Sequence, residues 1–168
     1  MKRVLTFVMA ALMVVAVSCT KDHPERHTVE AAVYCKEPVN DDLSSHMELY
    51  LIPQKDNLVD YYDGDGVLRP DDKMVKGYDW FKVTLETKDQ TDDIFNQDYK
   101  LINGNKFNVE SLRSGYGKVF WYTRNGAAAS GGTVKIGTNS VTLLARFPYK
   151  GWVEVTFEGD IVKYDHIF

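Results

Sequence analysis

The sequence lacks the short motifs that indicate an enzyme or a cofactor site. It contains no Gly-x-Ser-x-Gly elbow, no His-Glu-x-x-His zinc motif and no Cys-x-x-Cys pair. The segment 111–117 lacks the spacing and the Lys-Ser/Thr of a phosphate-binding loop. We therefore expect a protein that is not an enzyme and needs no cofactor. A hydrolase stays open as an alternative, because a glycosidase requires only two carboxylates across a cleft.

Excess positive charge and paired cysteines are also missing. Lys and Arg number 20 against 24 Asp and Glu, for a net charge of −4. A nucleic-acid partner would require a basic patch, so we expect none. The chain has two cysteines, Cys19 and Cys35. Cys35 continues the apolar alternation of residues 29, 31 and 33 and has no histidine beside it, which favours a buried structural thiol over a nucleophile.

The apolar run from Val4 to Val17 is too short for a membrane-spanning helix. It follows Lys2 and Arg3 and ends in small residues before Cys19. This pattern resembles the lipobox of bacterial lipoproteins, which implies cleavage before Cys19 and acylation of its thiol. An ordinary secretory signal is the alternative. We expect residues 1–18 to be the signal peptide, 19–27 a polar tether that contains Pro24, and 28–168 a single domain.

No segment sustains helical periodicity for more than two turns. Instead, short runs with every second residue apolar are separated by turn formers. They predict an all-β domain, an antiparallel meander that forms a lipocalin-like barrel or a two-layer β-sandwich, since alternation is common to both. The clearest runs form a C-terminal meander of four strands: 132–136, 140–147, 152–158 and 160–166. The other expected strands are 28–35, 46–52, 79–86, 118–124 and, around the hairpin turn Asn103-Gly104, 99–102 and 105–109.

An acidic, glycine-containing segment precedes the third of these strands. Asp63, Asp65 and Asp72 fall on the third, fifth and twelfth places of an EF-hand loop, with Gly66 on the sixth. Tyr61 holds the first place, where a carboxylate belongs, and no helical pattern flanks the segment. The three aspartates are candidate ligands of a noncanonical Ca²⁺ site. A solvated acidic loop is the alternative.

Three large aromatic residues lie on the polar faces of expected strands: Tyr50, Trp80 and Trp152. Exposed aromatic rings stack on sugars or pack on another protein, so these three are candidate ligand-binding residues. The alternative is that a second layer of the fold buries them.

Two regions carry a family resemblance. One is the leader, residues 17–22, and the other comprises residues 131–136, 141–143 and 153–161 in the C-terminal meander. Together they resemble the small β-rich lipoproteins of gut Bacteroidetes. The resemblance implies a lipocalin-like barrel or sandwich and an outer-membrane location, on the periplasmic or the cell-surface side. It carries over no functional residue.

Three hypotheses about function remain. The first is a non-enzymatic, lipid-anchored envelope protein that binds an apolar ligand or a glycan. The second is a structural or adhesive surface subunit that pairs a strand edge with a partner protein. The third is the hydrolase.

Overall fold

The computed structural model describes residues 20–36, 45–59, 75–87, 97–101 and 116–165. Apart from one short 3-10 helix, η1 (Lys55–Asn57), all regular structure in these residues is β, which confirms the fold class. The described residues contain no helical segment with the length and apolarity that a bilayer crossing requires. The strands are β1 (Glu25–Thr28), β2 (Ala31–Lys36), β3 (Ser45–Ile52), β4 (Trp80–Thr87), β5 (Gln97–Leu101), β6 (Tyr116–Tyr122), β7 (Ala127–Ala128), β8 (Gly131–Ile136), β9 (Ser140–Phe147), β10 (Gly151–Glu158) and β11 (Val162–Asp165).

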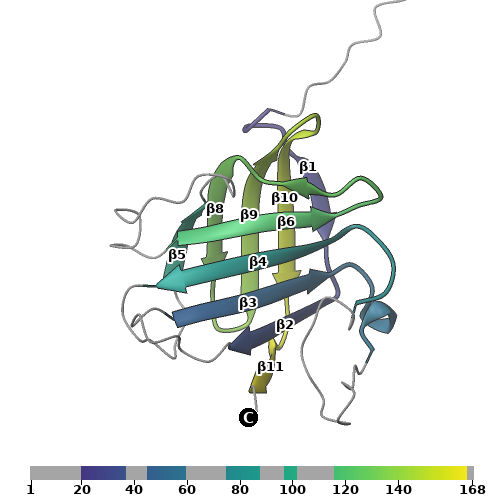
Figure 1. Ribbon diagram of the computed structural model, residues 1–168, viewed down its shortest axis with the longest axis vertical. Helices are drawn as coiled ribbons and strands as arrows, with labels where there is room; N and C mark the ends of the chain where they lie inside the picture. The colour runs from purple at the N-terminus through teal and green to yellow at the C-terminus, as the bar shows by residue number, and fades with distance from the viewer. Residues whose placement is uncertain (1–19, 37–44, 60–74, 88–96, 102–115, 166–168) are drawn as a thin grey trace, which may run out of the picture.

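All eleven strands belong to one sheet that curls into a half-barrel. Their order is β1-β10-β9-β8-β5-β6-β4-β3-β2-β11, with β7 paired to β6 outside this path. Figure 1 shows β2, β3, β4 and β6 crossing in front of β8, β9 and β10, so that the sheet forms two facing layers. The antiparallel meander is correct for β8, β9 and β10. The sheet as a whole is mixed, because β1 with β10, β5 with β6 and β2 with β11 are parallel pairs.

The chain passes from one end of the sheet order to the other between β1 and β2. The backbone N–H of Val29 still donates to Thr156 of β10, at 3.0 Å, whereas that of Glu30 donates to Ile52 of β3, at 3.0 Å. A strand that changes partners at a bend makes a corner between two sheet layers. Strand β1 starts at Glu25, within the segment 19–27 that was expected to be a polar tether.

The fourth strand of the expected meander makes a second corner. Instead of folding back on β10, β11 leaves it and pairs in parallel with β2. Gly159 lies at this departure with a φ of 145°, and its N–H donates to Asn139 O at 2.9 Å. Glycine adopts this positive φ without the penalty that a side chain brings. The Gly159-Asp160 pair thus redirects the strand rather than closing a hairpin.

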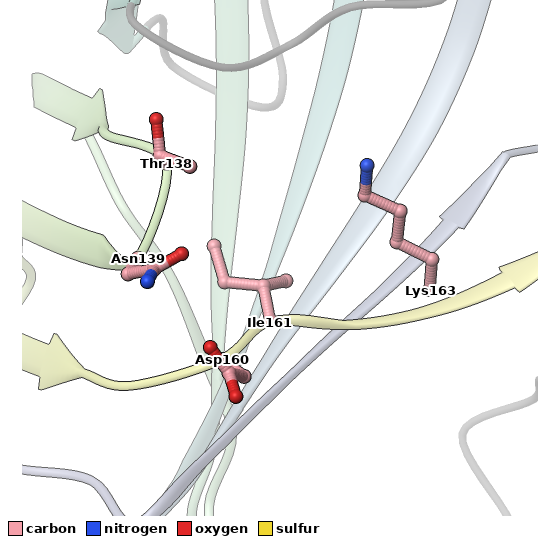
Figure 2. A pocket seen from close by; sticks show the side chains of 5 residues that line it. All are labelled: Thr138, Asn139, Asp160, Ile161 and Lys163. Carbon is pink, nitrogen blue, oxygen red and sulfur yellow. The ribbon is translucent and has the colours of Figure 1, made fainter.

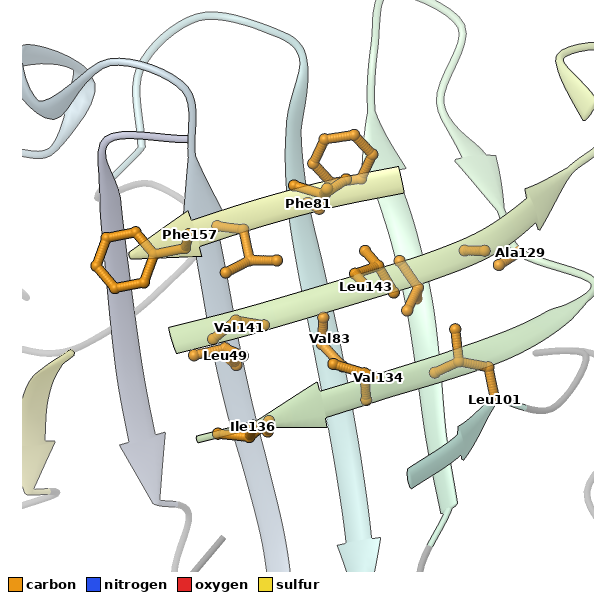
Figure 3. Packing of buried hydrophobic residues seen from close by; sticks show 14 of the residues in the cluster. Leu49, Phe81, Val83, Leu101, Ala129, Val134, Ile136, Val141, Leu143 and Phe157 are labelled. Atoms are coloured by element: carbon orange, nitrogen blue, oxygen red, sulfur yellow. The ribbon is translucent and has the colours of Figure 1, made fainter. Parts of the chain in front are cut away.

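The inner faces of the two layers enclose the main hydrophobic core. Figure 3 shows side chains of both layers meeting there, among them Phe81 and Val83 of β4 and Val141 and Leu143 of β9. Alternate residues of β3, β4, β9 and β10 are buried in this cluster, as the period of two predicts. Burying each such side chain contributes about 1.5–3 kcal/mol, so this cluster is the main source of stability.

The bend after β1 lies within the predicted strand 28–35. Beyond this bend, the residues that face the core alternate in the opposite phase. Val29 belongs to the main core, but so do Ala32 and Tyr34, whereas Val33 and Cys35 point to the outer side. The single alternation predicted through residues 29, 31, 33 and 35 is therefore wrong at its first residue. Cys35 is buried and forms no disulfide with a described residue, as expected.

A second hydrophobic cluster covers the outer side of β2, β3 and β4. It comprises Val33, Cys35, Tyr50, Ile52, Val75 and Trp80, with Ala31, Leu58 and Tyr122 packed against it. Rings from three adjacent strands stack there, with centroid distances of 3.7 Å between Trp80 and Tyr122 and 5.9 Å between Trp80 and Tyr50. Strand β4 was expected to have one wet face, and at Trp80 that expectation is wrong. On β6, Val119 and Trp121 are buried, while Phe120 is exposed.

Candidate functional site

A pocket of about 420 Å³ opens where β6 ends. Three segments far apart in the sequence line it: the residues just before β4, the end of β6 with the turn after it, and the turn between β9 and β10. The lining residues are Tyr78, Asp79, Trp121, Thr123, Arg124, Asn125 and Lys150. We call this the β6-end pocket.

The side chain of Thr123 stabilises the turn after β6. Thr123 Oγ1 accepts hydrogen bonds from the backbone N–H groups of Asn125, at 3.2 Å, and Gly126, at 3.1 Å. Such threonine-capped turns fix the backbone without a regular ladder. The turn leaves Arg124 and Asn125 exposed at the rim of the pocket.

Two residues with positive φ lie at the other two segments. Asp79 has a φ of 67°, and its N–H donates to Tyr122 O at 2.7 Å, which ties this segment to the end of β6. Tyr149 has a φ of 65° and is fully exposed beside Lys150. For residues other than glycine this conformation costs about 1–3 kcal/mol and is found preferentially at functional sites.

Trp121 contributes to the pocket from the edge of the main core and is only 2% exposed. Its ring stacks on Phe81 at 5.1 Å and meets His27 and Phe147 edge-on, each at 5.3 Å. His27 in turn lies within hydrogen-bond distance of Glu25, with Nε2 2.9 Å from Oε1. This packing fixes the orientation of the indole, which lies buried at the inner side of the pocket.

The indole Nε1 of Trp121 is buried and has no hydrogen-bond partner among the described residues. A buried donor that forms no hydrogen bond costs about 1–3 kcal/mol. Natural structures rarely leave such a group without a functional or structural reason.

The polar groups of the pocket are two cations and one acid. The Lys150 ammonium lies 5.5 Å from the centroid of the Trp121 ring, a cation–π contact. Within the described residues no ion pair joins Arg124, Lys150 or Asp79 to any other charged group. The pocket therefore offers the exposed ring of Tyr78, hydrogen-bonding groups and two cations that form no ion pair with a described residue.

A smaller pocket of about 300 Å³ lies where β9 begins, far along this strand from the β6-end pocket. Figure 2 shows Thr138 and Asn139 in the β8–β9 turn facing Asp160 and Ile161 of the link to β11, with Lys163 to one side. Thr138 and Lys163 already make interactions of their own. This pocket has no aromatic wall, so it is the weaker candidate.

The residues predicted from the sequence to bind a ligand do not come together. Tyr50 and Trp80 are buried in the outer cluster, so neither ring offers a free face to a ligand. Trp152 lies on the outer side of β10, half-buried, with the ammonium of Lys21 5.7 Å from its ring centroid.

The other predicted sites lie outside the described residues. These are the lipidation site Cys19 and the aspartates of the expected Ca²⁺ loop, Asp63, Asp65 and Asp72. Among the residues that are described, no group of three potential ligands could hold a metal ion. No protein-family model, no curated protein and no solved structure matches the chain.

The sequence did not identify the β6-end pocket. Its two turns were visible, one as the flexible segment after residue 124 and the other as Pro148-Tyr149-Lys150-Gly151. What was missing was their proximity, which arises because β6 and β9 lie in facing layers.

Proposed function

We propose that this protein is a lipid-anchored binding protein of the bacterial outer membrane, and that it takes a glycan in the β6-end pocket without altering it chemically. The observation that carries the proposal is the composition of this pocket: the 60% exposed ring of Tyr78 accompanies polar side chains from three segments, with the buried Trp121 beneath them. Sugars present apolar faces to aromatic rings and hydroxyl groups to polar side chains, so this composition suits them.

The charged groups of the β6-end pocket favour ligand binding over glycoside hydrolysis. Asp79 is the single carboxylate among the described residues that line the pocket, whereas glycoside hydrolysis requires two, placed about 5–10 Å apart. A filled interior also argues against an apolar ligand inside the half-barrel, because the inner faces of both layers already meet in the main core.

An adhesive subunit that adds a partner strand has less support. The two strands that end the sheet order, β1 and β11, have four residues each as described. Short terminal strands offer few unpaired backbone groups, which is how many proteins prevent edge pairing.

The experiment compares the full-length protein with its Cys19→Ser variant in a bacterial host. We expect the wild type in the membrane fraction with an acyl mass increment, and the variant in the soluble fraction without it. The soluble variant is then screened against a glycan panel by calorimetry and by the shift in melting temperature. Membrane association that persists in the variant would contradict the lipid anchor, and a panel with no binder would contradict the glycan proposal.

Two further substitutions locate the site once a glycan binds. Tyr78→Ala removes the exposed ring of the pocket and should weaken binding about two- to tenfold, the usual contribution of one aromatic contact. Trp152→Ala removes the predicted ring on the outer side of β10 and should leave the affinity unchanged. The reverse result would move the site to the outer side of β10.

A further inference from the structure

The β6-end pocket brings together two cations, Arg124 and Lys150, that form no ion pair with a described residue. Elsewhere Arg26 pairs with Glu154 at 3.0 Å, Lys82 with Glu48 at 2.9 Å, and Lys135 with Asp98 at 3.4 Å. In the pocket neither Arg124 nor Lys150 has an acid of the described residues within the 4 Å of an ion pair, and the same holds for other exposed cations such as Lys76 and Arg146. Charges that no neighbour neutralises attract an oppositely charged ligand.

The two cations come from turns whose positions are fixed. Arg124 belongs to the turn that Thr123 caps, and its side chain is exposed at the rim. Lys150 follows the strained Tyr149, and its exposed side chain places the ammonium 5.5 Å from the centroid of the Trp121 ring. A ligand that binds here has less side-chain freedom to remove than it would on an unrestrained surface, which favours affinity.

The charge balance of the pocket selects among anions. Two cations and the carboxylate of Asp79 give a net charge of one positive unit among the lining residues. A group with a single negative charge neutralises this excess, whereas a doubly charged phosphate would leave an uncompensated charge. The planar guanidinium of Arg124 is suited to two parallel hydrogen bonds with a carboxylate, and Asp79 can accept hydrogen bonds from neighbouring sugar hydroxyl groups.

We infer that the ligand of the β6-end pocket is an acidic sugar, whose single negative charge binds between Arg124 and Lys150. This inference rests on the proposed function, because it specifies the substrate class of the same site. A carboxylate and a sulfate ester share this single charge. The experiment therefore separates the two chemistries.

The test is calorimetry of the soluble Cys19→Ser protein with four probes: a uronic acid oligosaccharide, the same oligosaccharide with its carboxyl groups reduced to alcohols, a sulfated neutral oligosaccharide, and inorganic phosphate. We expect the acidic oligosaccharide to bind at least about tenfold more tightly than its reduced form, because a hydrogen-bonded ion pair is worth about 1.5–3 kcal/mol. Its affinity should fall as salt is raised, while that of the reduced form should not.

Matched variants locate the negative charge in the pocket. Arg124→Gln and Lys150→Met should each weaken the acidic oligosaccharide about tenfold and leave the reduced form nearly unchanged. The controls Arg26→Gln and Lys135→Met remove exposed cations from β1 and β8 and should change neither affinity. All four side chains are solvent-accessible, so melting temperatures should confirm that each variant folds.

The outcomes separate this inference from the proposed function. Equal binding of the acidic and reduced oligosaccharides would overturn the inference and leave glycan binding intact. Tightest binding of inorganic phosphate would also overturn it, as would an acidic oligosaccharide that binds equally well to both pocket variants. If the sulfated probe bound most tightly, the single negative charge of the ligand would be retained, but a sulfate ester and not a carboxylate would carry it. Failure of every oligosaccharide to bind would overturn both proposals.

Discussion

The two layers of the sheet differ in what their outer sides meet. On the layer formed by β2, β3 and β4, the outer side carries a hydrophobic cluster in which Tyr50 and Trp80 are fully buried. On the layer formed by β8, β9 and β10, the outer side carries threonines, charged residues and the half-buried Leu144 and Trp152. Both layers nevertheless show the same alternation in sequence. Alternation therefore indicates that the two faces of a strand differ in polarity, but it does not indicate which faces are exposed to solvent.

The difference extends to how neighbouring strands interact on each outer side. Across β3, β4 and β6 the contacts are stacked rings, and the ion pair of Lys82 with Glu48 is largely shielded from water, with 20% and 13% of the side chains exposed. Across β1 and β10 the contact is the Arg26–Glu154 pair, with 77% and 28% exposed. Desolvation strengthens both the apolar and the charged contacts of the first layer.

The largest expected effect compares two tryptophans on outer sides. Trp80→Ala should lower the free energy of unfolding by about 3–5 kcal/mol, because it empties a stacked, buried position. Trp152→Ala should lower it by less than about 1 kcal/mol, since that ring is only half-buried. Urea unfolding of the soluble domain measures both. Similar losses would show that the outer sides are equally buried in solution.

The next comparison uses adjacent residues of β9 that point to opposite sides. Leu143→Ala should cost about 2–5 kcal/mol, because Leu143 is wholly buried in the main core between the layers. Leu144→Ala, the matched control on the outer side, should cost about 1 kcal/mol or less. Denaturant melts of the two variants test the orientation of β9, and a reversed order would mean that its register is shifted by one residue.

The smallest effect concerns the two ion pairs. A double-mutant cycle on Lys82 and Glu48 should give a coupling free energy of about 1–3 kcal/mol, because the pair is shielded and Glu48 also accepts a hydrogen bond from Tyr50 at 2.5 Å. The same cycle on Arg26 and Glu154 should give about 0–1 kcal/mol. Thermal melts at low and high salt measure both couplings. If salt removes the first coupling as readily as the second, the pair is solvated.

Local pattern predicted the parts of the fold that depend on neighbours in sequence. The alternation of Met47, Leu49 and Leu51 placed these side chains in the main core, and the turns around Asn139 and Pro148 gave the antiparallel β8, β9 and β10. The parallel pairs of β1 with β10 and β2 with β11 had no such signal, because their partners lie at opposite ends of the chain. The expected hairpin at Asn103-Gly104 lies outside the described residues.

The local sequence pattern does not predict the candidate site, because the residues of the site also lie far apart in the sequence. Arg124 and Lys150 each belong to a turn that the sequence indicates, and Trp121 to a strand that it indicates. Their meeting depends on the crossing of two layers, which no short window of sequence encodes. Tyr50 and Trp80 lie on faces that the sequence predicts to be polar, yet both are buried, because their burial also depends on segments distant in sequence.

The strands at the two corners, β1 and β11, also determine when the fold can be completed. Strand β1 needs β10 as its partner, and β2 needs β11, so the earliest and latest residues of the domain close the sheet together. Pairing over such a separation is slow, because the loop-closure entropy is lost before the contact forms. A chain that crosses a membrane with its N-terminus first would hold β1 unpaired until its last segments arrive. Truncated chains would keep these strands open, so their unpaired edges would be more accessible to proteases than those of the finished fold.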